Sequence, residues 1–181
     1  MSPITAIAVI AGLTVAGVLV YRKKSYAETL ETSPTSAGGS GKWPYYDLIK
    51  KYADKYGVDP ALVAAHAKTE SGWDPSAVNL ENPELDYDSS YGLLQVQLAT
   101  AQDFGKVANY REATPGEVSW LMDVDHNVQV GAWNIARWQK KYPFDVAVQM
   151  YNVGESGYNR GYRNSGYLRR VKEAYDGYRT S

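Results

Sequence analysis

Cysteine is absent from the 181-residue sequence, and histidine occurs only twice, as His66 and His126. The absence of cysteine excludes disulfides, thiolate metal ligands and a cysteine nucleophile within this chain. Two widely separated histidines do not make the kind of cluster that ligates a metal. We therefore expect neither a metal site nor a cofactor.

A strong excess of charge is also lacking, because the formal net charge is only -1. Bulk attraction to nucleic acid is therefore not expected, and we predict no nucleic-acid partner. Phenylalanine is scarce as well, with 2 Phe against 16 Tyr and 5 Trp. Tyrosine and tryptophan combine an apolar ring with a polar edge, which suits a wet groove for sugars or other polymers. A tyrosine-rich core without any ligand would have the same composition.

One long apolar run is present, at residues 4–20. Extended to residues 2–21, it reaches the ~20 residues that a membrane-spanning helix needs. Arg22, Lys23 and Lys24 follow it directly, whereas a cleaved signal peptide carries its basic residues before the apolar segment. We therefore predict a transmembrane anchor at 2–21 that places this part of the chain in a lipid bilayer.

Residues 22–42 combine the basic stop with a segment rich in Ser, Thr, Gly and Pro, and this composition predicts a flexible linker. The folded domain is then expected at residues 43–181. Its apolar residues recur mostly at helical spacing, and no convincing strand pattern appears, so a mainly α fold is predicted. Helices are expected at 44–56, 60–71, 98–104, from Pro115 onward, at 123–142, 144–151 and 167–178, with loops at 74–91 and 157–166.

Glu70 is the leading candidate for chemistry. It lies at the end of an apolar helical run that begins at Asp59 and Pro60, a favoured N-cap and first residue. Gly72 is a natural helix stop, and Trp73 adds apolar surface close to the acid. A carboxyl held against apolar surface loses hydration, so its pKa rises and it can act as a general acid near neutral pH. An ordinary solvated glutamate in a last helical turn is the alternative.

Three separated segments resemble the motifs of the soluble lytic transglycosylases. Residues 70–77 (ESGWDPSA) are similar to the signature E-S-x-F/W-x-P-x-A. Residues 90–96 (SYGLLQV) resemble the G-L-M-Q-I/V segment, and residues 147–154 (AVQMYNVG) resemble A-x-x-A-Y-N-A-G. A lone E-S pair would be weak, but three motifs in the family's order are specific. The resemblance covers about residues 44–175.

The resemblance implies an α-helical, lysozyme-like (SLT) domain with a groove for peptidoglycan glycan strands. It implies cleavage of the β-1,4 bond between N-acetylmuramic acid (MurNAc) and N-acetylglucosamine (GlcNAc), leaving a 1,6-anhydro end. Glu70 would serve both as acid and as base in this reaction. The residues that the resemblance assigns to substrate binding are Ser71, Gly92, Leu94, Gln95, Tyr151, Asn152 and Tyr167.

Structural roles compete with several of these assignments. Gly92 and Asn152 could serve the backbone rather than the sugar, and Ser71 could cap its own helix. His66 precedes Glu70 by one helical turn, and we expect it to be a packed histidine.

The sequence also departs from the family pattern. Leu94 replaces the common Met, and the connection from 78 to 90 is long and acidic. The related goose-type lysozymes have an aspartate six residues before the motif glycine, a spacing that Asp86 has from Gly92. A muramidase that hydrolyses the bond with water activated by Asp86 therefore remains an alternative.

The setting has its own difficulty. The positive-inside rule places Arg22 and everything after it on the cytoplasmic side, away from a bacterial cell wall. A virion membrane would resolve this conflict, so local wall opening during phage genome delivery is favoured over a secretion or conjugation machine in the inner membrane. Virion or envelope-machine proteins would then be partners. A non-catalytic, peptidoglycan-binding virion protein is the competing class, and the presence of Glu70 argues against it.

Overall fold

The computed structural model describes residues 43–79 and 89–180, and all structural statements below concern these residues. They confirm the mainly α prediction. The anchor predicted at 2–21 and the linker at 22–42 lie outside the described residues. None of the described helices is both long and apolar enough to cross a bilayer. The helices are α2 (Tyr46–Tyr56), α3 (Pro60–Ser71), α4 (Leu98–Asp103), η2 (Tyr110–Glu112), α5 (Pro115–Met122), α6 (Val124–Lys141), α7 (Phe144–Asn159) and α8 (Ser165–Arg179).

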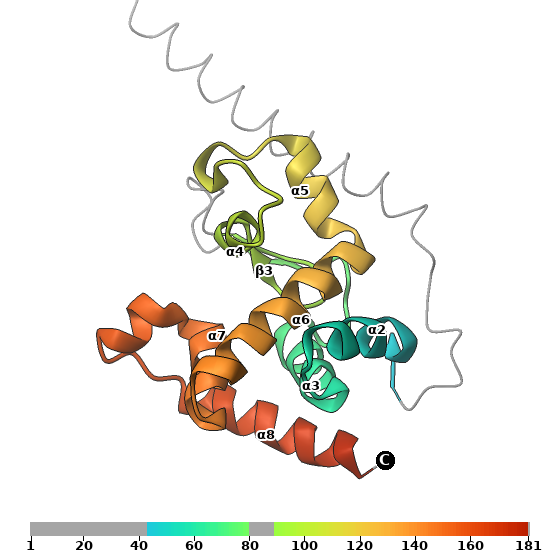
Figure 1. The fold of residues 1–181 in the computed structure, drawn as a ribbon, viewed down its shortest axis with the longest axis vertical. Helices are drawn as coiled ribbons and strands as arrows, with labels where there is room; N and C mark the ends of the chain where they lie inside the picture. Colours follow the sequence, from blue (N-terminus) through green and yellow to red (C-terminus); the bar gives the residue numbers. More distant parts are fainter. Residues whose placement is uncertain (1–42, 80–88, 181) are drawn as a thin grey trace, which may run out of the picture. The chain divides into compact units, whose positions relative to one another are not determined.

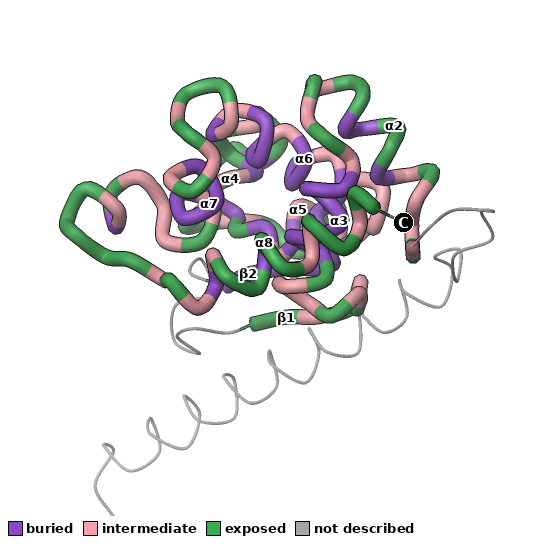
Figure 2. The backbone as a smooth tube through the Cα atoms, turned by 90° about the horizontal axis from the view of Figure 1, so that it is seen from below, coloured by how far each residue is buried: buried purple, intermediate pink, exposed green. Residues whose placement is uncertain are grey.

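Helix α6 organises the packing. It contacts α2, α3, α4, α5 and α7, and in Figure 1 it runs between α4 and α5 on one side and α2 and α3 on the other. Helix α8 packs mainly on α3 and also on α7. Figure 2 shows the buried segments of the backbone tube inside α3, α6 and α7, whereas β1 is exposed. The core therefore lies where α3, α6, α7 and α8 meet.

Helix α3 is buried along most of its length, since all residues from Ala61 to Ala67 are inaccessible. Alanine at four of these positions leaves room for neighbouring helices on every side. As predicted, the Asp59 side chain accepts the Ala61 N–H at the N-terminus, and Gly72 ends the helix with a left-handed φ of 66°. The caps fix both ends of the helix that carries Glu70.

A small antiparallel sheet joins α3 to α4. Its strands, in the order β1-β2-β3, are Val78–Asn79, Ser90–Tyr91 and Val96–Gln97. Val78 pairs with Tyr91, which pairs with Val96. The prediction of an unbroken loop at 74–91 is therefore wrong. Strands of two residues are too short to show an alternating pattern in the sequence.

Helix α7 is interrupted at Gly154, whose φ of 68° and ψ of 163° are not helical. The sequence predicts that the helix ends here, but it resumes and continues to Asn159. The predicted loop at 157–166 is therefore wrong in its first residues. The break lies where α7 borders the cavity described below, since Gly154 lines that cavity.

Candidate active site

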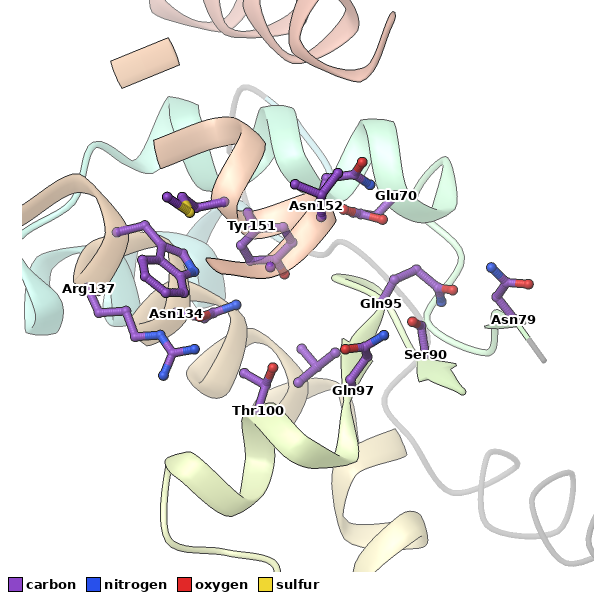
Figure 3. A pocket seen from close by; sticks show the side chains of 15 residues that line it. Glu70, Asn79, Ser90, Gln95, Gln97, Thr100, Asn134, Arg137, Tyr151 and Asn152 are labelled. Carbon is purple, nitrogen blue, oxygen red and sulfur yellow. The ribbon is translucent and has the colours of Figure 1, made fainter. Parts of the chain in front are cut away.

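A cavity of about 420 Å³ lies between α3, the small sheet, α6 and α7. Figure 3 shows Glu70, Gln95 and Tyr151 around one part of it and Asn134 and Arg137 around another. The cavity is lined by Glu70, Asn79, Ser90, Gln95, Val96, Gln97, Thr100, Asn134, Arg137, Trp138, Met150, Tyr151, Asn152, Val153 and Gly154. Among the described lining residues, Glu70 alone carries a carboxylate.

Glu70 lies in the last turn of α3, next to the carbonyl end of the helix. Neighbouring atoms surround its carboxylate although the residue keeps partial access to the cavity. This desolvation raises its pKa to about 7, against the opposing effects of a hydrogen bond from Tyr167 and the charge of Arg170. The negative end of the helix dipole acts in the same direction as desolvation. Glu70 can therefore hold a proton near neutral pH and also release it.

Tyr167 and His66 form a chain of hydrogen bonds behind the acid. The Tyr167 hydroxyl donates to Oε1 of Glu70 over 2.6 Å, and Nδ1 of His66 lies 2.8 Å from the same hydroxyl oxygen. Tyr167 and His66 are both buried. Burial lowers the pKa of His66 to about 3, so this ring is neutral at physiological pH. The expectation that His66 is packed is confirmed, and the packing joins it to the acid through Tyr167.

Tyr167 was assigned to substrate binding by the resemblance, but the structure places it behind Glu70. Only 2% of its surface is exposed, and it does not line the cavity. Its hydroxyl is occupied by Glu70 and His66. In this structure it therefore contacts the acid and not the cavity.

Tyr151 lines the cavity, and its hydroxyl donates to the backbone carbonyl of Leu94 over 2.7 Å. Its ring packs on His66 with the centroids 4.6 Å apart. Burial raises its pKa well above the ordinary value, and the charge of Glu70 adds to this. The ring thus stays neutral, and its hydroxyl ties α7 to the motif loop.

Gln95 also lines the cavity, with its side-chain amide fixed by two backbone carbonyls. Its Nε2 donates to Ala77 over 3.0 Å and to Gly92 over 2.9 Å. Both amide hydrogens are thereby used, so Oε1 is the part of this side chain left to accept from a ligand. The backbone of Gln95 itself is in the left-handed region, with a φ of 44°.

Gly92 is required by a close neighbour. A Cβ at this position would lie 2.6 Å from Nδ2 of Asn127, and the φ of 73° also favours glycine. Asn127 is fully buried and binds the loop on both sides, accepting from the Leu94 N–H and donating to the Tyr91 carbonyl. Gly92 does not line the cavity, so the close approach that it permits is to Asn127.

Leu94 and Ser71 lie outside the cavity lining. The Leu94 side chain is fully buried and packs against Gly131, where a Cβ would lie 2.4 Å from its Cδ1. The structure thus places it in the core rather than at a substrate, and only its carbonyl faces Tyr151. Ser71 donates to the carbonyls of Ala67 and Leu93. It therefore ties the end of α3 to the motif loop.

Asn152 lies at the cavity and is exposed, as its assignment to substrate binding requires. Its Oδ1 accepts from Nδ2 of Asn164, so its amide N–H groups are the part of this side chain left to donate to a ligand. Asp86 lies outside the described residues. Among the described residues, no group of three His, Cys, Asp or Glu side chains could hold a metal ion.

Sequence reasoning missed the α6 side of the cavity. Asn134, Arg137 and Trp138 line it from successive turns of this helix. The Arg137 guanidinium lies between the Trp133 and Trp138 rings, 4.7 and 4.6 Å from their centroids, and donates to Asp103. The i, i+3, i+4 spacing of these three residues places them on one face of the helix, and this pattern could have identified them from the sequence.

The chain is similar to known proteins over most of its described residues. A family model described as "Transglycosylase SLT domain" matches residues 47–173. The "Membrane-bound lytic murein transglycosylase C" of Edwardsiella ictaluri is 32% identical over 98 residues, which are 54% of this chain and 25% of the relative. The protein of the same name from Sodalis glossinidius is 30% identical over 99 residues, with the same two coverages of 54% and 25%. The one from Photorhabdus laumondii is 30% identical over 103 residues, covering 56% and 26%. The chain thus spans about a quarter of the length of these curated relatives.

Proposed function

The chain belongs to the transglycosylase SLT family, and from this premise we propose that it is a peptidoglycan lytic transglycosylase. It cleaves the β-1,4 bond between MurNAc and GlcNAc and leaves a 1,6-anhydro end on MurNAc. The names of its relatives, which describe lytic murein transglycosylases, support this. The observation that carries the proposal is the single carboxyl group with a pKa of about 7 at the described cavity.

In the first step, protonated Glu70 donates its proton to the glycosidic oxygen. The bond between this oxygen and C1 of MurNAc breaks, and GlcNAc leaves with a free 4-hydroxyl. Glu70 becomes a carboxylate, and the hydrogen bond from Tyr167 and the charge of Arg170 then stabilise it. A pKa near the working pH is the value at which a group can give up a proton and take it back.

In the second step, the C6 hydroxyl of the same MurNAc attacks C1. Glu70 takes the hydroxyl proton as the new C6–O–C1 bond forms, so the acid returns to its starting state. The substrate supplies the nucleophile, and the reaction therefore needs only one enzymic carboxylate. Glycosidases that use water or a covalent intermediate need two.

Substrate contacts are proposed for the polar groups that border the cavity. Oε1 of Gln95 accepts an N–H or O–H from the sugar, and the amide N–H groups of Asn152 donate to a carbonyl or hydroxyl. Tyr151 offers its ring face. Ser71, Gly92, Leu94 and Tyr167 support these groups through the backbone and the hydrogen bonds described above.

Mass spectrometry of the soluble products from purified peptidoglycan tests the proposal. Digestion by the full chain should release muropeptides with 1,6-anhydro-MurNAc ends. Products that have gained water and carry reducing ends would overturn the transglycosylase mechanism in favour of hydrolysis with Asp86. Asp86→Asn separates the two, because it should leave an anhydro-forming enzyme active and inactivate a hydrolase. A protein that binds peptidoglycan without releasing products would instead be the non-catalytic alternative.

The setting extends the proposal. The relatives are named membrane-bound, which supports a membrane location for the catalytic domain at 43–181, joined by the linker 22–42 to an anchor at 2–21. Local wall opening during phage genome delivery fits the basic residues that follow the anchor, with secretion or conjugation machines as the other settings. Protease protection of the full chain in sealed membrane vesicles tests the anchor and its orientation.

A further inference from the structure

The Tyr167 hydroxyl lies between two groups, each of which can either accept its hydrogen or donate a hydrogen bond to its oxygen. Oε1 of Glu70 is 2.6 Å away and Nδ1 of His66 is 2.8 Å away. A hydroxyl has one hydrogen, and an ionised carboxylate can only accept. When Glu70 is ionised, Tyr167 must therefore donate to Glu70, and His66 must donate to Tyr167 as the Nδ1–H tautomer.

We propose that His66 is a positioning residue that keeps this direction of donation in both ionisation states of Glu70. Tyr167 then always presents its hydrogen to Oε1, so the exchangeable proton of the acid is confined to Oε2. The catalytic part of this inference rests on the proposed function of Glu70 as the proton donor. The tautomer of His66 does not depend on that function.

The surroundings of His66 hold its tautomer. Reversing the chain would require Glu70 to donate from Oε1, Tyr167 to donate to His66, and His66 to carry its hydrogen on Nε2. Among the described residues, the hydrogen bond of the His66 ring is the one between Nδ1 and Tyr167, and only 1% of the residue is exposed. A buried N–H without an acceptor is costly, so the reversed chain is disfavoured.

Because the Tyr167 hydrogen bond occupies Oε1, Oε2 is the oxygen of Glu70 that remains to carry the proton to the substrate. The titratable and charged groups around Glu70 come from three elements: His66 on α3 acts through Tyr167, Tyr151 lies on α7, and Tyr167 and Arg170 lie on α8. Arg170 favours the carboxylate at either oxygen and cannot choose between them. The choice is made by the hydrogen-bond chain from His66.

Nitrogen-15 NMR of the full chain with labelled histidine tests the tautomer directly. The sequence has two histidines, so His126→Asn assigns both signals. His66 should remain neutral with its hydrogen on Nδ1 at pH 5 and at pH 8.5, on either side of the Glu70 transition. An Nε2–H signal at either pH, or a charged ring between them, would overturn the proposal even if the enzyme is active.

Two variants test the consequence for catalysis. His66→Leu removes the donor, whereas His66→Asn retains an N–H close to the place of Nδ1–H. For His66→Leu we expect kcat to fall roughly tenfold and the alkaline limb of the pH–rate profile to move upward, because an unsupported Tyr167 is a weaker donor to the carboxylate. His66→Asn should keep kcat and the alkaline limb close to their parent values, and His126→Asn should change neither quantity.

If kcat falls equally in His66→Leu and His66→Asn, or if the pH–rate profile does not move, His66 serves only in packing and the proposal is overturned. Thermal unfolding of both variants separates these outcomes from loss of fold. If the parent releases no products from peptidoglycan, the proposed function fails while the NMR result still decides the tautomer.

Discussion

Within residues 43–79 and 89–180, two glutamates accept a hydrogen bond from a tyrosine, and their pKa values are shifted in opposite directions. Tyr167 donates to Glu70 over 2.6 Å where α3 meets α8, and Tyr142 donates to Glu155 over 2.7 Å where α6 meets α7. The pKa of Glu70 is raised to about 7, whereas that of Glu155 is lowered. The tyrosine bond therefore does not decide the outcome.

The direction of each pKa shift depends on the solvation of the carboxylate and on the neighbouring cation. Lys141 binds Glu155, whose side chain is 41% exposed, and this ion pair with the Tyr142 bond holds the carboxylate form. At Glu70 the loss of water outweighs both the Tyr167 bond and the charge of Arg170, which does not form a direct ion pair with it among the described contacts. Burial of the carboxyl group at the end of α3 therefore gives Glu70 the raised pKa that an acid needs.

The largest expected difference between the two sites is in activity. Glu70→Gln should lower peptidoglycan cleavage by about 10²–10⁴-fold, because the proton donor and acceptor is lost. Glu155→Gln should stay within about twofold, as for an ordinary surface change. Release of soluble muropeptides measures both. Substantial activity in Glu70→Gln with an intact fold would remove Glu70 from the mechanism.

The second difference is in the sign of the pH dependence of stability. Because the folded pKa of Glu70 is raised from 4.5 to about 7, folded Glu70 binds a proton that unfolded Glu70 releases in this range. Its contribution is thus lost as pH rises from 4.5 to 7, by up to roughly 3 kcal/mol. Glu70→Gln should therefore become more stable than the parent at pH 8 and comparable to it at pH 4.

Denaturant unfolding at these two pH values measures the change. Glu155→Gln should have the opposite sign at pH 8, because its lowered pKa means that the carboxylate is the favoured folded form. If Glu70→Gln is destabilised at pH 8, the carboxylate is not desolvated in the folded state.

Substitution of the two tyrosines should change activity by less than substitution of Glu70. Tyr167→Phe removes the bond to Glu70 and leaves the His66 donor unpaired, so we expect a loss of about 1–2 kcal/mol in transition-state stabilisation, roughly tenfold in kcat. The alkaline limb of the pH–rate profile should also move upward. Tyr142→Phe is the matched control and should change neither quantity. Equal effects of the two substitutions would contradict the comparison.

The smallest effect is expected at the cations. Arg170 lowers the pKa of Glu70 through its charge, so Arg170→Gln should move the alkaline limb of activity, near pH 7, upward by a few tenths of a unit. Added salt should reduce this shift, since Arg170 is exposed. Lys141→Gln, the counterpart at Glu155, should leave the pH–rate profile unmoved. A downward shift of the alkaline limb in Arg170→Gln would contradict the claim that Arg170 lowers the pKa of Glu70.

Local features of the domain were predictable from the sequence. Asp59 and Gly72 cap α3 as predicted, and α5 begins at Pro115 as predicted, where Thr114 and Glu117 form a capping box. Each depends on residues within a few positions of one another, so a local pattern carries the information. Glu70 was identified in the same way, from its helix, its stop and its motif.

Long-range features were not predictable. The bond from Tyr167 to Glu70 joins residues 97 positions apart, and Asn127 reaches Gly92 from another helix. Leu94 belongs to a motif assigned to substrate binding, but its side chain packs on Gly131 and lies in the core. A motif identifies which residues belong to the site, and only the packing decides which of them face the cavity.

The bond between Glu70 and Tyr167 also has a consequence for the order of folding. Helix α3 precedes α8 in the chain, so Glu70 is synthesised long before the helix that covers it, and contacts of such sequence separation form late. Until α8 docks, Glu70 is a solvated carboxylate that is ionised at neutral pH and cannot act as an acid. We therefore expect a partly synthesised chain that lacks α8 to be inactive, because Glu70 gains its raised pKa only after α8 has docked on α3.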